Sequence, residues 1–334
     1  MIVVVCLNPA LDITHHVAAV ERGGVNRPGA VHDRPGGKGL NVARTLAALG
    51  ADVLVTGLAG GITGAGVTAA LEALGVTAAF APVSGETRRT FTVVDASLAD
   101  RSTTSFHEAG PIVSAAELAG FRDRYQEALA GAEAVVLSGS LPLGLPPGTY
   151  AELIETAAAA AVPAVLDAHG QALRLGTAAG PAIVKPNLTE LESLTGRSLA
   201  AQPGGGRAAG TGADLAAVAE AAAELRGAGA GAVVATLGPE GMLAVTADGC
   251  WRARPAAAVA GNATGAGDAV AAALAHGLVR GRPWDERLRH AVALGAATAA
   301  APVAGEFRDE DYHGTLGAVT VERIPAQAPA EGVR

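Results

Sequence analysis

The residues with the clearest chemical potential form the run Asn262-Ala263-Thr264-Gly265-Ala266-Gly267-Asp268, which leads into an apolar stretch typical of a helix. The two glycines allow backbone N–H groups to converge on an anion at a helix N-terminus, where the helix dipole also favours negative charge. An aspartate at this point, Asp268, suits a general base that accepts a hydroxyl proton beside a phosphoryl group in transfer. The same pattern also fits an aspartate cap that closes a glycine turn, so the run by itself leaves both interpretations open.

A second glycine-rich run, Arg34-Pro35-Gly36-Gly37-Lys38-Gly39-Leu40-Asn41, precedes another helical segment. Its glycines bring the backbone close to a ligand, while Lys38 and Asn41 supply charge and hydrogen bonds. The spacing differs from that of the phosphate-binding loop of nucleoside triphosphatases. The loop after the first apolar run, residues 8–12, is not glycine-rich. The chain therefore lacks the dinucleotide-binding pattern, and a nicotinamide-dependent oxidoreductase is a poor fit.

A third run, Val184-Lys185-Pro186-Asn187-Leu188-Thr189-Glu190, follows the end of an apolar strand. Ligands of parallel sheets lie at the carboxyl ends of the strands. Asn187 and Glu190 therefore suit contact with a hydrated Mg²⁺ on a nucleotide. Capping of the following helix, with the glutamate helped by the helix dipole, explains the same two residues equally well.

Short β-branched runs alternate with Ala- and Leu-rich segments of helical periodicity along most of the chain. Most of the runs are continuously apolar, which is typical of strands covered on both faces. Strands followed by helices imply right-handed crossovers and a parallel sheet between two helical layers. The expected strands are 2–7, 52–56, 134–137, 164–166, 182–184, 232–236 and 242–246. The expected helices are 39–49, 64–74, 115–129, 147–160, 188–194, 214–228 and 267–279.

Two segments, 13–31 and 87–107, interrupt this alternation because they contain alternating apolar and polar residues without an intervening helix. They predict antiparallel strands outside the main sheet, forming a small lid that pairs with itself. Residues 196–212 are rich in glycine and predict a flexible surface insertion. Residues 321–334 are expected to form a C-terminal tail.

Composition excludes several classes of protein. The net charge of -8 argues against nucleic-acid binding, because there is no excess of basic residues to displace counterions from phosphates. The first apolar run is too short and lacks the basic flank of a signal peptide, and the other apolar stretches fall short of the ~18 residues of a membrane span. The two cysteines form neither a disulfide framework nor a zinc motif. We therefore expect a soluble cytoplasmic protein with no membrane partner.

Taken in order, the motifs resemble those of the PfkB/ribokinase-like family of small-molecule kinases. The residues that carry the resemblance are Leu11-Asp12, Gly36-Gly37-Lys38-Gly39-x-Asn41, Ser138-Gly139-Ser140-Leu141-Pro142, Lys185-Pro186-Asn187-x-x-Glu190, Thr236-Leu237-Gly238-x-x-Gly241 and Gly265-Ala266-Gly267-Asp268. The set is most similar to the 1-phosphofructokinase and tagatose-6-phosphate kinase branch. The resemblance implies a ribokinase-like three-layer α/β/α domain over residues 1–320, with a mostly parallel central sheet and a small β-sheet lid.

The resemblance also implies roles for individual residues in ATP- and Mg²⁺-dependent phosphorylation of a sugar hydroxyl. Asp268 matches the catalytic base, in a turn that forms an anion hole with Gly265, Ala266 and Gly267. The positions implied in sugar binding are Asp12, Gly36, Gly37, Asn41 and Ser138, and those implied in gripping a phosphate already on the sugar are Arg27, Lys38 and Arg88. The positions implied in nucleotide binding are Lys185, Asn187, Thr236, Gly238, Gly241 and Asn262, with Glu190 and Asn187 near Mg²⁺.

Substrate identity stays open at this point. A ketohexose phosphate, namely fructose 1-phosphate, fructose 6-phosphate or tagatose 6-phosphate, explains why three cations converge on the sugar site. A kinase of the same fold for an unphosphorylated sugar or nucleoside gives no reason for those cations. A non-catalytic sugar-sensing module gives no reason for the base Asp268. We expect Arg34 and Arg89 to be solvated surface charges, and we expect the lid to pair across a homodimer.

Overall fold

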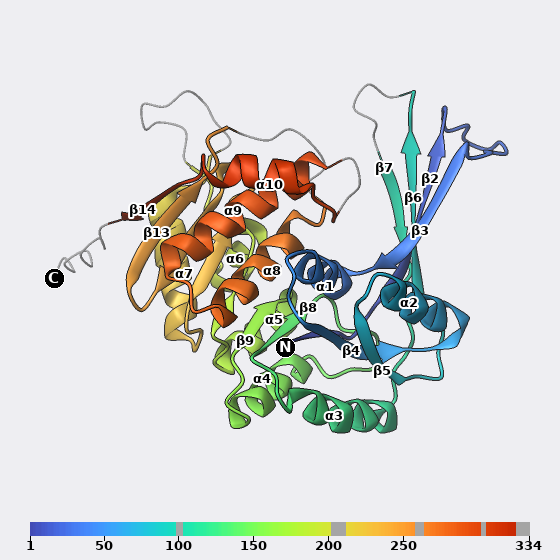
Figure 1. Cartoon of the computed structure of the whole chain (residues 1–334), viewed down its shortest axis with the longest axis horizontal. Coiled ribbons are helices and arrows are strands. Elements are labelled where there is room, and N and C mark those ends of the chain that lie inside the picture. The colour runs from blue at the N-terminus through green and yellow to red at the C-terminus, as the bar shows by residue number, and fades with distance from the viewer. Residues whose placement is uncertain (98–102, 202–211, 258–263, 302–304, 325–334) are drawn as a thin grey trace.

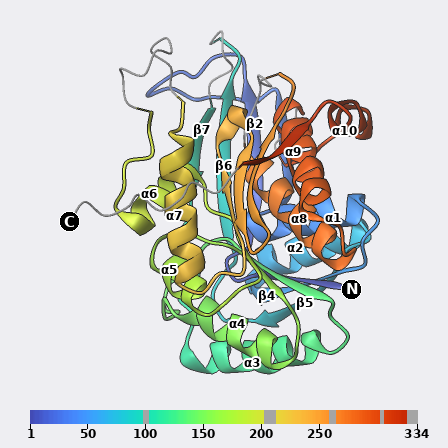
Figure 2. The ribbon, with the colours of Figure 1, turned by 90° about the vertical axis from the view of Figure 1, so that its left-hand side faces the viewer.

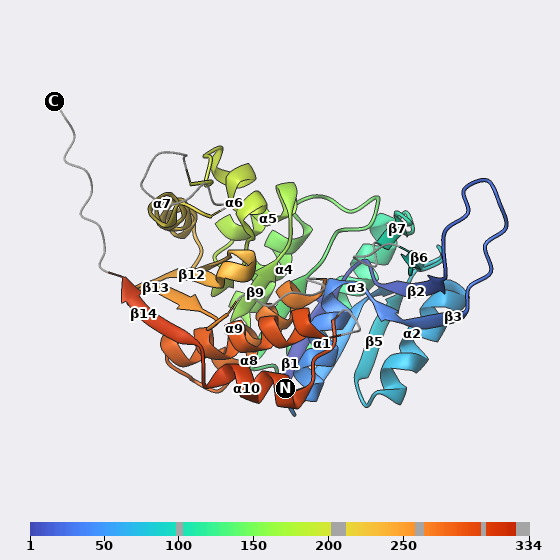
Figure 3. The ribbon, with the colours of Figure 1, turned by 90° about the horizontal axis from the view of Figure 1, so that it is seen from above.

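A ten-stranded sheet separates two layers of helices in the computed structural model of the chain (Figures 1 and 3). The structure describes residues 1–334 except 98–102, 202–211, 258–263, 302–304 and 325–334. The N-terminal strand lies in the interior of the sheet, and every residue of that strand is buried. This burial explains why its sequence is continuously apolar rather than alternating.

The sheet is parallel at its centre and at one edge and antiparallel at the other. Six neighbouring pairs from β5 to β11 run parallel, whereas the last three pairs are antiparallel. In order across the sheet the strands are β14 (Thr320–Ile324), β13 (Gly249–Arg254), β12 (Met242–Thr246), β11 (Val233–Thr236), β10 (Ile183–Val184), β9 (Ala164–Asp167), β8 (Ala134–Ser138), β1 (Ile2–Cys6), β4 (Val53–Ala59) and β5 (Thr77–Pro82).

The helices divide between the two faces of the sheet, as Figure 2 shows. The helices on one face are α3 (Ala115–Leu129), α4 (Thr149–Ala159), α5 (Gly170–Ala178), α6 (Leu188–Thr195) and α7 (Leu215–Gly227). The helices on the other face are α1 (Lys38–Ala48), α2 (Gly61–Ala73), α8 (Ala266–Val279), α9 (Trp284–Ala300) and α10 (Asp309–Leu316). A short 3₁₀ helix, η1 (Gly238–Glu240), joins β11 to β12. Each face encloses its own apolar core, which confirms the expected three-layer α/β/α arrangement.

A separate four-stranded sheet projects from the body as the lid (Figure 1). Its order is β3 (Ala30–Gly36), β2 (Ala10–Val17), β6 (Arg88–Asp95) and β7 (Thr103–His107). The prediction of purely antiparallel strands was wrong in one respect, because β2 and β6 pair in parallel. Alternation of residues fixes which face of a strand is buried but not the direction of its neighbour.

Several elements differ from the sequence expectations. Helices α5, α9 and α10 and strands β5, β13 and β14 were not predicted. Strand β14 occupies part of the expected tail, because Thr320–Ile324 pairs with β13 at the edge of the sheet. The expected insertion at 196–212 lies largely outside the described residues, although Ala200 and Ala213 form an isolated antiparallel bridge at its base. Among the described residues, no helix is long and apolar enough to cross a membrane.

Close packing of α1 on β1 sets the position of the glycine-rich loop. A Cβ on Gly39 would lie 2.6 Å from the Cβ of Cys6, a distance that side chains do not tolerate. Glycine therefore lets the first turn of α1 approach the end of the central strand directly. The side chains of Lys38 and Asn41 are thereby held beside the carboxyl edge of the sheet.

Candidate active site

Three adjacent parallel strands end at a common edge, and each delivers a polar residue to it. Strand β8 ends at Ser138, β9 ends at Asp167, and β10 is followed directly by Lys185. The edge opens on a cleft of about 1480 Å³ that also reaches the lid, α1, α8 and α9. The predicted site residues that line this cleft are Asp12, Gly37, Lys38, Asn41, Arg88, Lys185, Asn187, Thr236, Gly238, Gly241, Gly265, Ala266, Gly267 and Asp268.

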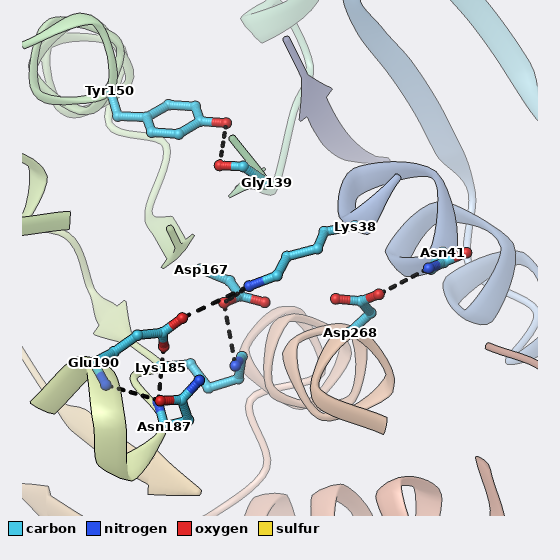
Figure 4. Close-up of polar contacts among 9 residues, drawn as sticks. All are labelled: Lys38, Asn41, Gly139, Tyr150, Asp167, Lys185, Asn187, Glu190 and Asp268. Carbon is cyan, nitrogen blue, oxygen red and sulfur yellow. Dashed lines mark hydrogen bonds and ion pairs between the residues drawn. The ribbon is translucent and has the colours of Figure 1, made fainter. Parts of the chain in front are cut away.

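Asp268 lies in the first turn of α8, where backbone N–H groups point out of the helix. Gly265 precedes that turn with φ of 85°, a left-handed conformation that glycine adopts readily. The Asp268 side chain is 5% exposed and accepts a hydrogen bond of 2.8 Å from Nδ2 of Asn41 (Figure 4). This bond joins the two glycine-rich runs, which are separated by more than half of the chain.

Burial favours the protonated form of Asp268, and the nearby negative charge of Asp167 adds to that effect. The Asn41 hydrogen bond and the amines of Lys38 and Lys185 act in the opposite direction. The balance raises the pKa of Asp268 to about 7. A carboxyl group with a pKa near neutrality is well matched to accept and release a proton.

Two lysines share the buried carboxylate of Asp167 (Figure 4). Oδ1 of Asp167 lies 3.2 Å from Nζ of Lys185 and 3.4 Å from Nζ of Lys38. Oδ2 of Asp167 and Oγ of Ser138, its partner across β8 and β9, have no hydrogen-bond partner in the described part of the chain. The Lys38 amine also lies 3.9 Å from Oε1 of Glu190. Although burial opposes the charged amine, the two carboxylates raise the pKa of Lys38.

Asn187 and Glu190 cap α6 reciprocally. The backbone N–H of Glu190 donates to Oδ1 of Asn187 at 2.8 Å, and the backbone N–H of Asn187 donates to Oε2 of Glu190 at 2.9 Å. The capping interpretation of these residues is therefore confirmed. Oε1 of Glu190 takes no part in the cap and faces Lys38 instead, so capping leaves one carboxylate oxygen available for another role.

The sugar-binding side predicted from the sequence lies where β2 and β3 meet. Gly36 packs against Asp12, since a Cβ on Gly36 would lie 2.0 Å from the Asp12 carboxyl group. Arg34 was expected to be a solvated surface charge, and this was wrong. Arg34 lies opposite Asp12 in the register of β2 and β3, and it lines the cleft. Its Nη1 lies 3.8 Å from Oε1 of Glu306. Arg89 is exposed and pairs with an exposed glutamate, as expected of a surface charge.

Some predicted residues do not line the cleft. Arg27 is exposed on the loop between β2 and β3, and Gly36, Ser138 and Glu190 are not part of the cleft lining. Asn262 lies outside the described residues. The roles implied for these positions stay predictions.

Sequence reasoning missed residues whose partners are distant in the chain. Asp167 ends an apolar strand at the carboxyl edge of the sheet, and that position was the available signal. Glu306 bridges Arg34 and Arg44, with its Oε1 2.9 Å from Nη2 of Arg44. Nothing in the local sequence around Glu306 indicates either arginine.

Comparison with known proteins identifies the family. The model described as pfkB family carbohydrate kinase matches residues 5–309. Phosphofructokinase-2 from Escherichia coli, solved with potassium, superimposes with a TM-score of 0.84 at 28% identity, covering 95% of this chain and 98% of that one. The same protein with fructose-6-phosphate gives 0.81 at 29%, with the same coverage. A possible 1-phosphofructokinase from Thermotoga maritima gives 0.83 at 25%, covering 97% and 99%.

These findings define a ribokinase-like α/β protein with a small second sheet and a charged cleft at the carboxyl edge of its main sheet. The chain belongs to the pfkB family of carbohydrate kinases. It is an ATP-dependent sugar kinase.

Asp167→Asn should destabilise the fold by about 3–5 kcal/mol, because the Lys185 side chain, only 4% exposed, would lose its buried counter-ion. Lys38→Met should cost less than about 1 kcal/mol, since the Lys38 side chain is 39% exposed and Asp167 keeps Lys185. Urea unfolding of both variants measures the difference. Equal losses of stability would contradict the assigned pairing.

Proposed function

We propose that this kinase transfers the γ-phosphoryl group of ATP to a hydroxyl of a ketohexose phosphate. The observation that carries the proposal is the bond between Asp268 and Asn41 inside the cleft. It places a carboxyl group of near-neutral pKa at a helix N-terminus, beside the loop predicted to hold the sugar. The fructose-6-phosphate bound to the Escherichia coli phosphofructokinase-2 is consistent with this class of substrate.

In the proposed reaction Asp268 accepts the proton of the attacking hydroxyl group as that oxygen bonds to the γ-phosphorus of ATP, while the bond from this phosphorus to the β–γ bridging oxygen breaks and ADP leaves. Asn41 fixes the orientation of the carboxylate, and the turn formed by Gly265, Ala266 and Gly267 offers N–H groups to the charge that develops on the phosphoryl oxygens. Lys185 lies close to this turn, since a Cβ on Gly267 would be 3.5 Å from its Nζ. The lysine amines therefore add positive charge at the point of transfer.

We assign Lys38 to the transferring phosphoryl group rather than to the phosphate already on the sugar. Its amine lies between Asp167 and Glu190, next to Lys185, and its charge acts on Asp268. Arg88 then remains as a lining cation for the phosphate on the sugar. Arg34 also lines the cleft, and it lies opposite Asp12 in the register of β2 and β3, close to the proposed sugar-binding side.

Mg²⁺ fits the donor set next to the lysines. Glu190 presents a carboxylate oxygen outside its capping bond, and Asn187 lines the cleft. No group of three or more His, Cys, Asp or Glu side chains able to hold a metal occurs within the described ranges. Mg²⁺ needs only one or two protein ligands, because it keeps several water ligands and also binds the phosphate oxygens of the nucleotide. When bound, the ion would neutralise charge on the β- and γ-phosphates, while Glu190 and Asn187 would position it.

ATP fits the remainder of the cleft beyond the lysines. Thr236, Gly238 and Gly241 line it near η1, and small residues of α9, including Gly295 and Ala299, form the opposing wall. Gly241 has φ of 89°, and a Cβ there would lie 2.2 Å from the carbonyl oxygen of Ala253. Glycine is therefore required at this turn, which lies beside the proposed nucleotide side of the cleft.

We also propose that the lid pairs across a homodimer. Its cleft-lining face carries Ser105 and His107, whereas the alternate residue Phe106 faces the opposite side and is 62% exposed. Phe106 pairs with Phe91 across β6 and β7, and Val31 of β3 is 55% exposed. Apolar side chains on an exposed sheet face favour burial against another surface.

Asp268→Asn should lower kcat by about 10²–10⁴ while nucleotide affinity changes little, because only proton acceptance is lost. Steady-state kinetics and equilibrium ATP titration measure the two effects. Turnover close to that of the unmodified enzyme would refute the assignment of Asp268 as base.

The pH dependence follows from the pKa of about 7 for Asp268. Because the base must be deprotonated, kcat/KM should fall about tenfold per pH unit below that value and level off above it. A pH–rate profile over pH 5.5–9 measures this limb, and the residual activity of Asp268→Asn should lack it. A limb that persists in the variant would assign the titration to another group.

Arg88→Ala should raise the KM for a phosphorylated sugar at least about tenfold and leave the KM for ATP nearly unchanged, because a cation facing a dianion is removed. Arg89→Ala, one residue along and already paired with Glu108, is the matched control. Equal changes for both substrates would favour a kinase of an unphosphorylated sugar or nucleoside.

Phe106→Asp should shift the protein from dimer to monomer in sedimentation velocity, since a charge would be buried in the proposed apolar contact. Glu108→Gln, close by on the same segment, serves as the control because Glu108 pairs with Arg89 within the lid. A monomeric unmodified protein would reject the lid dimer.

A further inference from the structure

Asn8 is a buried polar residue to which the proposed chemistry gives no role. It follows the central strand β1 and is 7% exposed. Its Nδ2 donates to Oγ of Ser140 at 3.1 Å and to the carbonyl oxygen of Ala109 at 3.3 Å. The main-chain carbonyl oxygen of Asn8 accepts a hydrogen bond of 3.2 Å from Nε of Arg88. One residue thus contacts three segments that are far apart in the sequence.

These contacts lie at the base of the lid. Arg88 is the first residue of β6, where the chain enters the lid hairpin, and Ala109 follows the end of β7, where the chain leaves it. Asn8 fastens both ends of this hairpin to β1. Through Ser140 it also fastens them to the loop that follows β8. Asn8 therefore fixes the base of the β6–β7 hairpin relative to the carboxyl edge of the main sheet.

The backbone at Gly110 packs closely against the Asn8 side chain. Gly110 has φ of 94°, and a Cβ there would lie 2.4 Å from Oδ1 of Asn8 and 3.5 Å from Cδ of Arg88. Oδ1 of Asn8 is buried without a hydrogen-bond partner among the described residues. A buried carbonyl oxygen without a partner costs free energy, so Oδ1 of Asn8 does not itself stabilise the fold. Both donor hydrogens of the amide are used to hold neighbouring segments.

We propose that Asn8 is a positioning residue that sets the guanidinium group of Arg88 for the phosphate on the sugar. Nε of Arg88 is engaged by the Asn8 carbonyl group, which leaves the two terminal nitrogens for a bidentate contact with a phosphate in the cleft that Arg88 lines. The Asn8 side chain acts indirectly, because its two bonds hold the backbone that carries this carbonyl group. The inference rests on the proposed role of Arg88 in binding a phosphorylated sugar.

A double-mutant cycle between Asn8→Ala and Arg88→Ala tests the proposal, with KM for a ketohexose phosphate and KM for ATP as separate readouts. Asn8→Ala alone should raise the KM for the sugar phosphate about tenfold, the loss expected for one or two hydrogen bonds, and change the KM for ATP less than about twofold. In the Arg88→Ala background, Asn8→Ala should have no further effect on the sugar KM.

Additive effects of the two substitutions, or an equal rise in both KM values, would overturn the proposal and reduce Asn8 to a structural role. An unchanged sugar KM in Arg88→Ala alone would overturn the phosphosugar assignment together with the inference. The first failure leaves the proposed function standing and the second does not, so the two are distinguishable.

Two further variants test the same role of Asn8 if Asn8→Ala does not fold. Ser140→Ala removes one of the two side-chain bonds, and its smaller rise in sugar KM, about threefold, should likewise vanish in the Arg88→Ala background. Gly110→Ala should reproduce the selective rise in sugar KM by displacing Oδ1 of Asn8. Gly75→Ala is its control, because Gly75 has a similar φ of 74° with nothing within 4 Å. A Gly110→Ala effect no larger than that of Gly75→Ala would count against the proposal.

Discussion

The charge pairing of Asp167 with Lys38 and Lys185 is the interaction on which the site depends. Asp167 has no exposed surface, so its charge must be compensated within the protein. The parallel sheet supplies one of the partners by geometry, because the backbone N–H of Lys185 donates to the carbonyl oxygen of Leu166 and brings β10 alongside β9. Lys38 comes from α1 on the other side of the edge. The Asp167 carboxylate thus holds two amines together, one from the end of the sheet and one from α1.

Under the proposed function, this arrangement explains how an acidic protein presents positive charge to phosphates. The chain has a net charge of -8, yet two amines are gathered beside the N-terminus of α8. In the absence of phosphate, carboxylates compensate both amines, and so the site does not carry unpaired buried cations. Glu190 lies 3.9 Å from Lys38 and restrains it further. The carboxylates offset the cost of desolvating the amines before any nucleotide binds. The site is preorganised in this sense.

The sequence predicts most of the layers and the glycine-rich turns because their signals are local. Continuous apolar runs identify the central strands. Gly37 and Gly265 predict helix N-termini, and the structure confirms both, since α1 and α8 begin directly after them. The Ala-rich helix α9 and the strands β13 and β14 escape prediction because their periodicity is weak. Asp167 and Asn8 escape it for another reason. Each is a single polar residue at or just after the end of an apolar strand, and its role depends on partners that only the three-dimensional fold brings near.

The link between Asn41 and Asp268 ties the two halves of the proposed reaction together. Nδ2 of Asn41 donates to Asp268, while its Oδ1 is buried with no hydrogen-bond partner in the described part of the chain. Gly305 packs close to the same side chain, since a Cβ there would lie 3.2 Å from the Asn41 amide group. Under the proposed function, a sugar hydroxyl group that donates to this free oxygen satisfies a buried acceptor and simultaneously lies beside the base. Substrate binding and proton acceptance then share one amide, so a sugar without a hydroxyl group at that position leaves the acceptor unpaired and the base without a substrate proton.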